Sequence, residues 1–297
     1  MAASVRGRLL KLSRERREEF HGLLTRYALE RLLYRLGLSG HREQFVLKGA
    51  MLFPLWKSEP HRPTRDLDLL GKGNPTIAHL EQVFGEVCRV SAGEDGIQFL
   101  PDTVVGVQIR EDQVYEGVRI RLVARLAGAT IPLQIDIGFG DVVTPAPTEV
   151  EYPTILDFPP PRLQAYPRET VIAEKLQAMV TLGIANSRMK DFYDVWVLAQ
   201  SFAFEGDLLC RAIQATFARR STPAPLSPPL ALTSVFSQDK EAQWTAFLRR
   251  SRLQAADVPF ADVVRTLQEF LLPPMLALAR SEPFDLAWTG SPPWRSV

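Results

Sequence analysis

The chain has 297 residues, of which 46% are hydrophobic and 23% are charged. This balance excludes a disordered protein and a disulfide-stapled miniprotein, and the length suffices for one large domain or two modest ones. The 35 Lys and Arg residues nearly balance the 34 Asp and Glu residues, so the net charge of +1 excludes a uniformly basic nucleic-acid-binding protein.

Periodicity predicts alternating helices and strands over the first half of the chain. Apolar residues at helical spacing predict one long amphipathic helix over 13–38. A short apolar run over 44–48 then predicts a buried strand that turns at Gly49 into a helix over 50–56. The later elements are a strand that contains Asp66 and Asp68 and closes at Gly71, a helix that begins near Pro75, and three strands rich in Val and Ile over 103–109, 118–126 and 131–137.

Prolines separate this half from a second, helical half. Seven prolines between residues 144 and 167 predict a segment without helix or regular strand pairing, and we place a domain junction there. Helices are expected over 168–182, 189–201, 238–250 and 261–279. We therefore expect an α+β fold, with a mixed α/β domain over 1–150 and a mainly helical domain over 151–297.

Two aspartates on the second strand are the first candidates for chemistry. Asp66 and Asp68 are two residues apart, so in a strand they share one face, whereas Leu67 and Leu69 enter the opposite face. Two carboxylates placed this way repel each other unless a cation lies between them. Mg²⁺ is the usual cation where carboxylate and phosphate oxygens meet, although a solvated strand end would also explain an isolated Asp-x-Asp.

Two further features strengthen the metal hypothesis. The strand before Gly49 leads directly into a helix, where backbone N–H groups can meet phosphate oxygens. Asp136 lies in a strongly apolar strand, and its parity matches that of a strand next to the one with Asp66. Asp136 is therefore either a third metal-binding carboxylate or a structural residue in a salt bridge.

Four separated motifs, in order over residues 20 to 200, resemble those of the AbiEii/AbiGii toxin family within the polymerase-β-type nucleotidyltransferase superfamily. The motifs are Tyr27-Ala-Leu-Glu-Arg31-Leu-Leu-Tyr-Arg35-Leu, Phe45-Val-Leu-Lys-Gly49-Ala, Arg62-x-Thr64-x-Asp66-Leu-Asp68-Leu, and Glu174-Lys175 followed by Asn186-Ser-Arg188-Met-Lys190-Asp191-Phe-Tyr-Asp194. The resemblance implies a nucleotidyltransferase-type mixed sheet with flanking helices. It also implies a nucleoside triphosphate (NTP) substrate, Mg²⁺ and a cognate antitoxin as partner.

The resemblance also assigns roles to residues. Asp66 and Asp68 are expected as catalytic metal ligands, with Asp136 as a further ligand. Lys175 is expected to contact the triphosphate or the transition state, and Asp191 is expected as the late acidic residue, whereas Asp194 is expected to be structural. The residues expected to bind the nucleotide are Lys48, Gly49, Thr64 and Arg65. Ala50 departs from the family pattern, which has a second glycine or small hydroxyl residue there, so one side-chain contact to phosphate is missing.

The resemblance implies a toxin that transfers a nucleoside monophosphate from NTP to an RNA 3′ end, with tRNA as the expected acceptor. The alternatives are transfer to a protein or small molecule, and a non-catalytic module that binds an antitoxin. Residues 1–48 carry a net charge of +6, and their basic side chains are either a solvated helix face or a contact surface for RNA. The residues considered for this surface are Arg14, Arg16, Arg17, Arg26 and Arg31.

The expected location is the cytoplasm, without membrane association. The N-terminus is charged within eight residues and lacks the apolar segment of a secretory signal, and no apolar stretch is long enough to cross a bilayer. Cys88 and Cys210 lack the ligand spacing of a zinc site and fit a reducing compartment.

Overall fold

The computed structural model describes residues 1–57, 61–111, 115–253 and 257–296. The chain forms two compact units, each described here by itself. The first comprises Met1–Asp141 and Thr148–Tyr166, and the second comprises Val142–Pro147 and Pro167–Val297. Among the described residues, no helix is both long enough and apolar enough to span a membrane.

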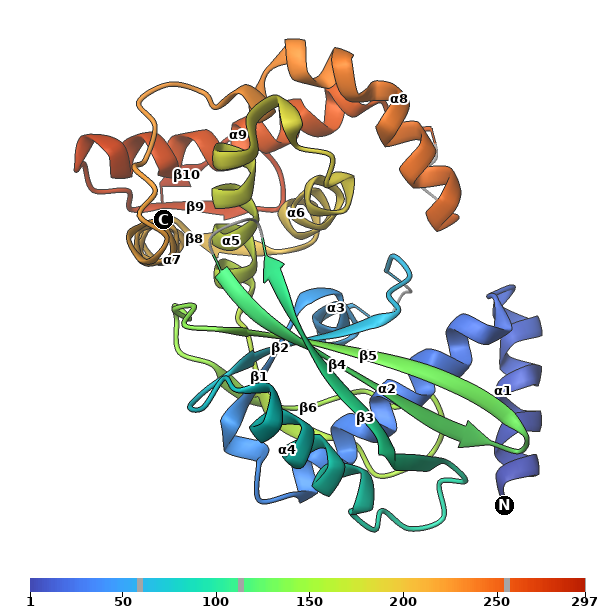
Figure 1. The fold of residues 1–297 in the computed structure, drawn as a ribbon. Helices are drawn as coiled ribbons and strands as arrows, with labels where there is room; N and C mark the ends of the chain where they lie inside the picture. Colours follow the sequence, from blue (N-terminus) through green and yellow to red (C-terminus); the bar gives the residue numbers. More distant parts are fainter. Residues whose placement is uncertain (58–60, 112–114, 254–256, 297) are drawn as a thin grey trace. The chain divides into compact units, whose positions relative to one another are not determined.

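The first unit is built on a mixed seven-stranded sheet with the strand order β3-β4-β5-β2-β1-β7-β6 (Figure 1). Strands β2 and β5 are parallel, as are β1 and β7, whereas the other neighbouring strands are antiparallel. The strands are β1 (Phe45–Lys48), β2 (Asp66–Gly71), β3 (Gln98–Glu111), β4 (Tyr115–Leu126), β5 (Ala129–Phe139), β6 (Thr148–Glu151) and β7 (Arg162–Ala165). The expected mixed sheet and α+β class are confirmed.

Alternation along the strands gives this sheet one apolar face and one polar face. Leu67 and Leu69 of β2 are buried, as are Ile135 and Ile137, their register partners on β5. Helices α2 (Phe20–Leu38) and α4 (Ile77–Arg89) pack against the sheet, and Ile77 of α4 lies near the buried side chain of Ile120 (Figure 1). The charged residues between these apolar positions therefore lie on the opposite face of the central strands.

The expected single helix over 13–38 is wrong, because the chain breaks at residues 17–19. Helix α1 (Ala2–Arg16) ends where Arg17 adopts a left-handed backbone conformation with φ 54°. Glu19 then caps α2, accepting hydrogen bonds from the backbone N–H groups of His21 and Gly22. A side-chain acceptor at this position starts a new helix, and no apolar residue between Leu12 and Phe20 marks the break in the sequence.

The proline-rich segment also differs from the expectation. Strands β6 and β7 pair with each other at the edge of the sheet, and β7 pairs with β1. The prolines at 153, 159, 160 and 161 lie between these two strands rather than within them. Proline is compatible with strand pairing when it stays outside the hydrogen-bonded residues.

The second unit is largely helical. Helices α5 (Arg168–Leu182) and α6 (Met189–Ser201) have the expected bounds, and α8 (Ser234–Ser251) and α9 (Phe260–Arg280) confirm the last two expected helices (Figure 1). Helix α7 (Gly206–Arg219) and a small sheet were not predicted. That sheet consists of β8 (Ala203–Glu205), β9 (Leu286–Thr289) and β10 (Arg295–Ser296). The core includes the buried Trp244, which stacks on Phe260 of α9 with 5.1 Å between the ring centroids.

Candidate active site

A row of charged residues crosses the polar face of the first unit's sheet. The strand register places Lys48 of β1 opposite Asp68 of β2, Asp68 opposite Asp136 of β5, and Asp136 opposite Arg119 of β4. Side chains at directly paired positions share one face of a sheet. Four strands therefore present a row with the charge order positive, negative, negative and positive. Asp66 lies on the same face, two residues before Asp68.

Gly49 leaves the space that the Asp68 carboxylate occupies. The backbone of Gly49 has φ +75°, and a Cβ atom there would lie 2.0 Å from Asp68 Oδ2 and 2.7 Å from its Cγ. Only glycine fits both the conformation and the close approach. The segment after it is a single 3₁₀ turn, Gly49–Leu52, followed by the four-residue helix α3 (Phe53–Trp56). So short a segment has little helix dipole, so the clearest role of Gly49 is steric.

Asp136 is held by a basic partner, one of the two outcomes expected from its apolar strand. Arg119 donates from Nε to Asp136 Oδ1 and from Nη2 to Oδ2, both at 2.8 Å. Gln134 Nε2 donates to Oδ2 at 3.3 Å. The hydrogen bonds between Arg119 and Asp136 raise the pKa of Arg119 above its usual range, and the charges of Asp136, Asp66 and Asp68 act in the same direction. The guanidinium thus balances part of the negative charge on this face.

The carboxylates of this face fit Mg²⁺ as a pair. Mg²⁺ is usually bound by one or two carboxylates and completes its six ligands with waters and substrate phosphate oxygens. Asp66 and Asp68 are half-buried on the polar face and match that donor set. Over the described ranges, no group of three or more His, Cys, Asp and Glu side chains has the arrangement of a metal site.

Sequence reasoning missed Arg119, although the strand carries a signal for it. Residues 118–122 alternate apolar and basic side chains, as expected for a strand with one buried and one polar face. Recognising the partner of Asp136 requires the pairing register of β4 with β5, which the sequence alone does not give.

The residues expected to bind nucleotide have mixed environments. Lys48 is buried, and its Nζ lies 3.3 Å from Asp141 Oδ2 in an ion pair at the end of β5. The hydroxyl of Thr64 donates to the backbone carbonyl oxygen of Asp66 at 3.1 Å and so fixes the start of β2. Arg65, next to it, is exposed. Gly49 and Thr64 therefore shape the backbone around the two aspartates.

In the second unit, Lys175, Asp191 and Asp194 form an ion cluster. Lys175 Nζ on α5 lies 2.5 Å from Asp191 Oδ1 and 2.9 Å from Asp194 Oδ2, both on α6. Arg188 Nε lies 2.6 Å from the other oxygen of Asp191. Burial favours the protonated acid, but the charges of Lys175 and Arg188 outweigh it and hold the pKa of Asp191 below its usual range. Asp191 and Asp194 share one helix face, as their spacing predicted.

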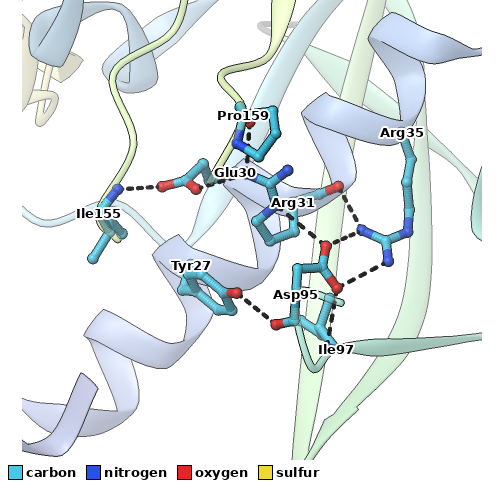
Figure 2. A network of polar contacts seen from close by, with 8 residues as sticks. All are labelled: Tyr27, Glu30, Arg31, Arg35, Asp95, Ile97, Ile155 and Pro159. Carbon is cyan, nitrogen blue, oxygen red and sulfur yellow. Dashed lines mark hydrogen bonds and ion pairs between the residues drawn. The ribbon is translucent and has the colours of Figure 1, made fainter. Parts of the chain in front are cut away.

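The first of the four motifs has a structural role, because its charged residues form a buried network on α2 (Figure 2). Asp95 accepts hydrogen bonds from Arg31 Nε at 3.2 Å and from Arg35 Nη1 at 2.7 Å. Tyr27 donates from its hydroxyl to the Asp95 carbonyl oxygen at 2.6 Å. The expectation that Arg31 contacts RNA is wrong, since its side chain is fully buried.

The same network contains a carboxyl group with an unusual pKa. Glu30 Oε2 accepts from the backbone N–H of Ile155 at 2.7 Å, and Arg31 donates to the carbonyl oxygen of Pro159 at 3.0 Å (Figure 2). Burial raises the pKa of Glu30 from 4.5 to about 7, although the contacts with Ile155 and Arg31 oppose the shift. These contacts tie α2 to the loop between β6 and β7.

Exposed basic side chains of the N-terminal region gather on and beside α1. Helix α1 buries Val5, Leu9 and Ser13 against the first unit and exposes its basic residues. We call these residues the basic surface of α1: Arg6, Arg8, Lys11, Arg14, Arg16 and Arg17. By contrast, Arg26 is half-buried and paired with Glu18.

Comparison with known proteins gives one family and two similar structures. A proposed nucleotidyltransferase from H. pylori has 15% identity and a TM-score of 0.47, over 88% of this chain and 93% of that chain. The Helicobacter pylori protein JHP933 has 13% identity and a TM-score of 0.48, over 88% and 90%. No curated protein matches the chain. The family model described as nucleotidyl transferase AbiEii toxin, type IV TA system, matches residues 31–271. The chain therefore belongs to the AbiEii family of nucleotidyl transferase toxins of type IV toxin–antitoxin systems.

Proposed function

We propose that the chain transfers a nucleoside monophosphate from NTP to the 3′ end of an RNA, with tRNA as the acceptor, in a Mg²⁺-dependent reaction in the cytoplasm. One observation carries the proposal: Asp66 and Asp68 lie half-buried on one face of β2, and the backbone of Gly49 leaves space for the Asp68 carboxylate. Two carboxylates so close are stable together when a cation compensates their charges. The antitoxin partner follows from the toxin–antitoxin family.

The reaction would proceed by attack of the RNA 3′ hydroxyl oxygen on the α-phosphorus of the NTP. A new P–O bond forms between the 3′ oxygen and the α-phosphorus, the bond from the α-phosphorus to the oxygen that bridges to the β-phosphate breaks, pyrophosphate leaves, and the hydroxyl proton is released to solvent. Mg²⁺, when bound by Asp66 and Asp68, would neutralise charge on the attacking and leaving oxygens. The protein would mainly position the two substrates and exclude competing geometries.

Further residues are proposed for the triphosphate. Lys175 would contact it or the transition state, with Asp191 holding the ammonium in place at 2.5 Å. Lys48 and Arg65 would add positive charge near the nucleotide, and Gly49 and Thr64 would shape the backbone of its site.

The acceptor is proposed from charge. The basic surface of α1 exposes six cationic side chains with Glu15 as the acid within the same helix. Phosphodiester backbones bind such surfaces through ion pairs and release counterions, which makes binding weaker at high salt. An RNA acceptor fits this surface better than a small uncharged acceptor does.

Acceptor identity can be tested with purified protein and each of the four α-labelled NTPs. Total tRNA, a protein extract and buffer alone are offered in parallel, with Mg²⁺ or with EDTA. Label in the tRNA fraction that requires Mg²⁺ supports the proposal. Label in protein, or in small molecules, would assign one of the alternative acceptors. Absence of label in every fraction, while growth arrest persists in cells that express the Asp66→Ala variant, would favour the non-catalytic module.

A further inference from the structure

We propose that Arg119 binds the phosphate oxygens of the triphosphate, and that Asp136 is the positioning residue that aims its guanidinium. The proposal rests on the function proposed above and adds to it a phosphate-binding residue that the four motifs do not contain. It also gives Asp136 a role other than that of a metal ligand.

The first support is the location of Arg119. Its strand position places it on the polar face, at the end of the row that also contains Asp136 and Asp68. Arg119 is thus two strands away from Asp68 in that row, and the charges of Asp66 and Asp68 act on its guanidinium. A triphosphate held by a metal at those carboxylates would bring its own negative oxygens to the same face.

The second support is hydrogen-bonding capacity. A guanidinium has five N–H donors, and Arg119 uses two of them in its fork with Asp136. None of the other residues described in the structure accepts from the remaining three donors. The Arg119 side chain is 28% exposed, whereas that of Asp136 is 14% exposed. Arg119 is therefore oriented by one carboxylate and still accessible to a ligand from solvent.

The third support is the chemistry of the pair. Arginine is the preferred side chain for planar, bidentate contacts to phosphate, and it binds more tightly when its orientation is fixed before the ligand arrives. Asp136 accepts hydrogen bonds from Arg119 and from Gln134. Both of its oxygens thus have donors, which fits a residue that holds a cation in place.

Inorganic tripolyphosphate is the probe, because it has the phosphates without the base or the reaction. Its affinity for the full chain is measured by calorimetry in EDTA and in Mg²⁺. The key variant is the Arg119→Gln/Asp136→Asn double variant, which leaves the local net charge unchanged and pairs two amides. We expect it to bind tripolyphosphate about 10- to 100-fold more weakly than the wild type. Unchanged affinity, or no measurable binding by the wild type, would overturn the proposal.

The Asp136→Asn single variant tests the positioning role. Removing a negative charge should by itself strengthen binding of an anion, whereas loss of the fork with Arg119 should weaken it. We expect the Asp136→Asn variant to bind tripolyphosphate more weakly than the wild type does. Its melting temperature should be close to that of the double variant. Equal or tighter binding would contradict the positioning role.

Arg125→Gln is the matched control. Arg125 is exposed, on the same strand and the same face as Arg119 but six residues away, and its substitution should leave tripolyphosphate affinity unchanged. Filter binding of tRNA forms a separate arm. If the Arg119 substitutions weaken tRNA binding and leave tripolyphosphate binding intact, Arg119 serves the acceptor and the proposal is wrong. Because binding is measured without turnover, this result stands apart from whether the chain transfers nucleotides.

Discussion

The substitution Gly49→Ala tests the contact between the glycine turn and the Asp68 carboxylate. A non-glycine residue in the left-handed region costs about 1–2 kcal/mol, and φ at Gly49 is +75°. The added methyl group would also lie 2.0 Å from Asp68 Oδ2 and 2.8 Å from Asp68 Cβ, and such overpacking costs about 1–3 kcal/mol more. The free energy of unfolding should therefore fall by about 2–5 kcal/mol.

Gly73→Ala separates the two contributions. Gly73 has φ +90°, but a Cβ there has nothing within 4 Å, so this variant should lose only the backbone part, about 1–2 kcal/mol. In an Asp68→Ala background the Oδ2 and Cγ contacts are gone and only the 2.8 Å contact with Cβ remains, so the cost of Gly49→Ala should fall towards that of Gly73→Ala. Urea denaturation of the four proteins in this cycle gives the coupling energy, which we expect at about 1–2 kcal/mol.

Gly49→Ala should also slow nucleotide transfer. If the Gly49→Ala chain remains folded, its Asp68 carboxylate is displaced, and nucleotide transfer should fall at least about 100-fold. The reasoning is refuted if Gly49→Ala costs no more than Gly73→Ala, or if its cost is the same with and without the Asp68 carboxylate.

Three further predictions concern the buried network, the ion cluster and the basic surface. Folding raises the pKa of Glu30 from 4.5 to about 7. Its contribution to the free energy of unfolding is therefore complete below pH 4.5 and is lost as the pH rises through 7. Between pH 5.5 and 8 the free energy of unfolding should fall by at most about 2 kcal/mol from this group. Urea denaturation should show this loss in the wild type and not in Glu30→Gln, and equal pH dependence would contradict it. Lys175→Met leaves two buried carboxylates without their shared cation and should lower the free energy of unfolding by about 3–5 kcal/mol. Substitution of the exposed Lys190 by Met should change it by less than about 0.5 kcal/mol. Equal costs for the two variants would show that the ion cluster does not stabilise the packing of α5 on α6. Substituting Arg14, Arg16 and Arg17 by Gln should weaken tRNA binding and reduce the slope of log affinity against log salt by up to about 3, and an unchanged slope would exclude the basic surface of α1 from the RNA contact.

Strand parity was the most informative signal in the sequence. The spacing of Asp66 and Asp68 predicted one shared face, and the parity of Asp136 predicted a neighbouring strand, which the pairing of Asp68 with Asp136 confirms. The identity of the cross-strand partner, Arg119, depends on register between β4 and β5. Register is set by the hairpin and by burial of a whole face, so it cannot be read from one strand alone.

Local backbone events account for the wrong predictions. No apolar residue lies between Leu12 and Phe20, so apolar periodicity gives no information where Arg17 turns left-handed and the carboxylate of Glu19 caps the next helix. The proline count between residues 144 and 167 likewise conceals two four-residue strands, because the prolines fall beside the paired residues and not among them.

The ion cluster illustrates a different limit. Lys175 was expected near substrate from a resemblance, and its distances to Asp191 and Asp194 depend on how α5 packs against α6. The sequence predicted both helices with their observed bounds. It could not predict that one ammonium group serves two buried carboxylates, since that requires the packing of two helices.

The transfer reaction itself is tested most directly by following separately labelled phosphates of NTP into RNA. The wild-type chain is incubated with tRNA and either α-labelled or γ-labelled NTP, beside the Asp66→Asn and Asp68→Asn variants checked for unchanged melting temperature. We predict that only the α label enters RNA and that each variant loses at least about 100-fold of the rate. Entry of the γ label, or undiminished transfer by the folded variants, would contradict a nucleotidyl transfer that depends on the β2 aspartates.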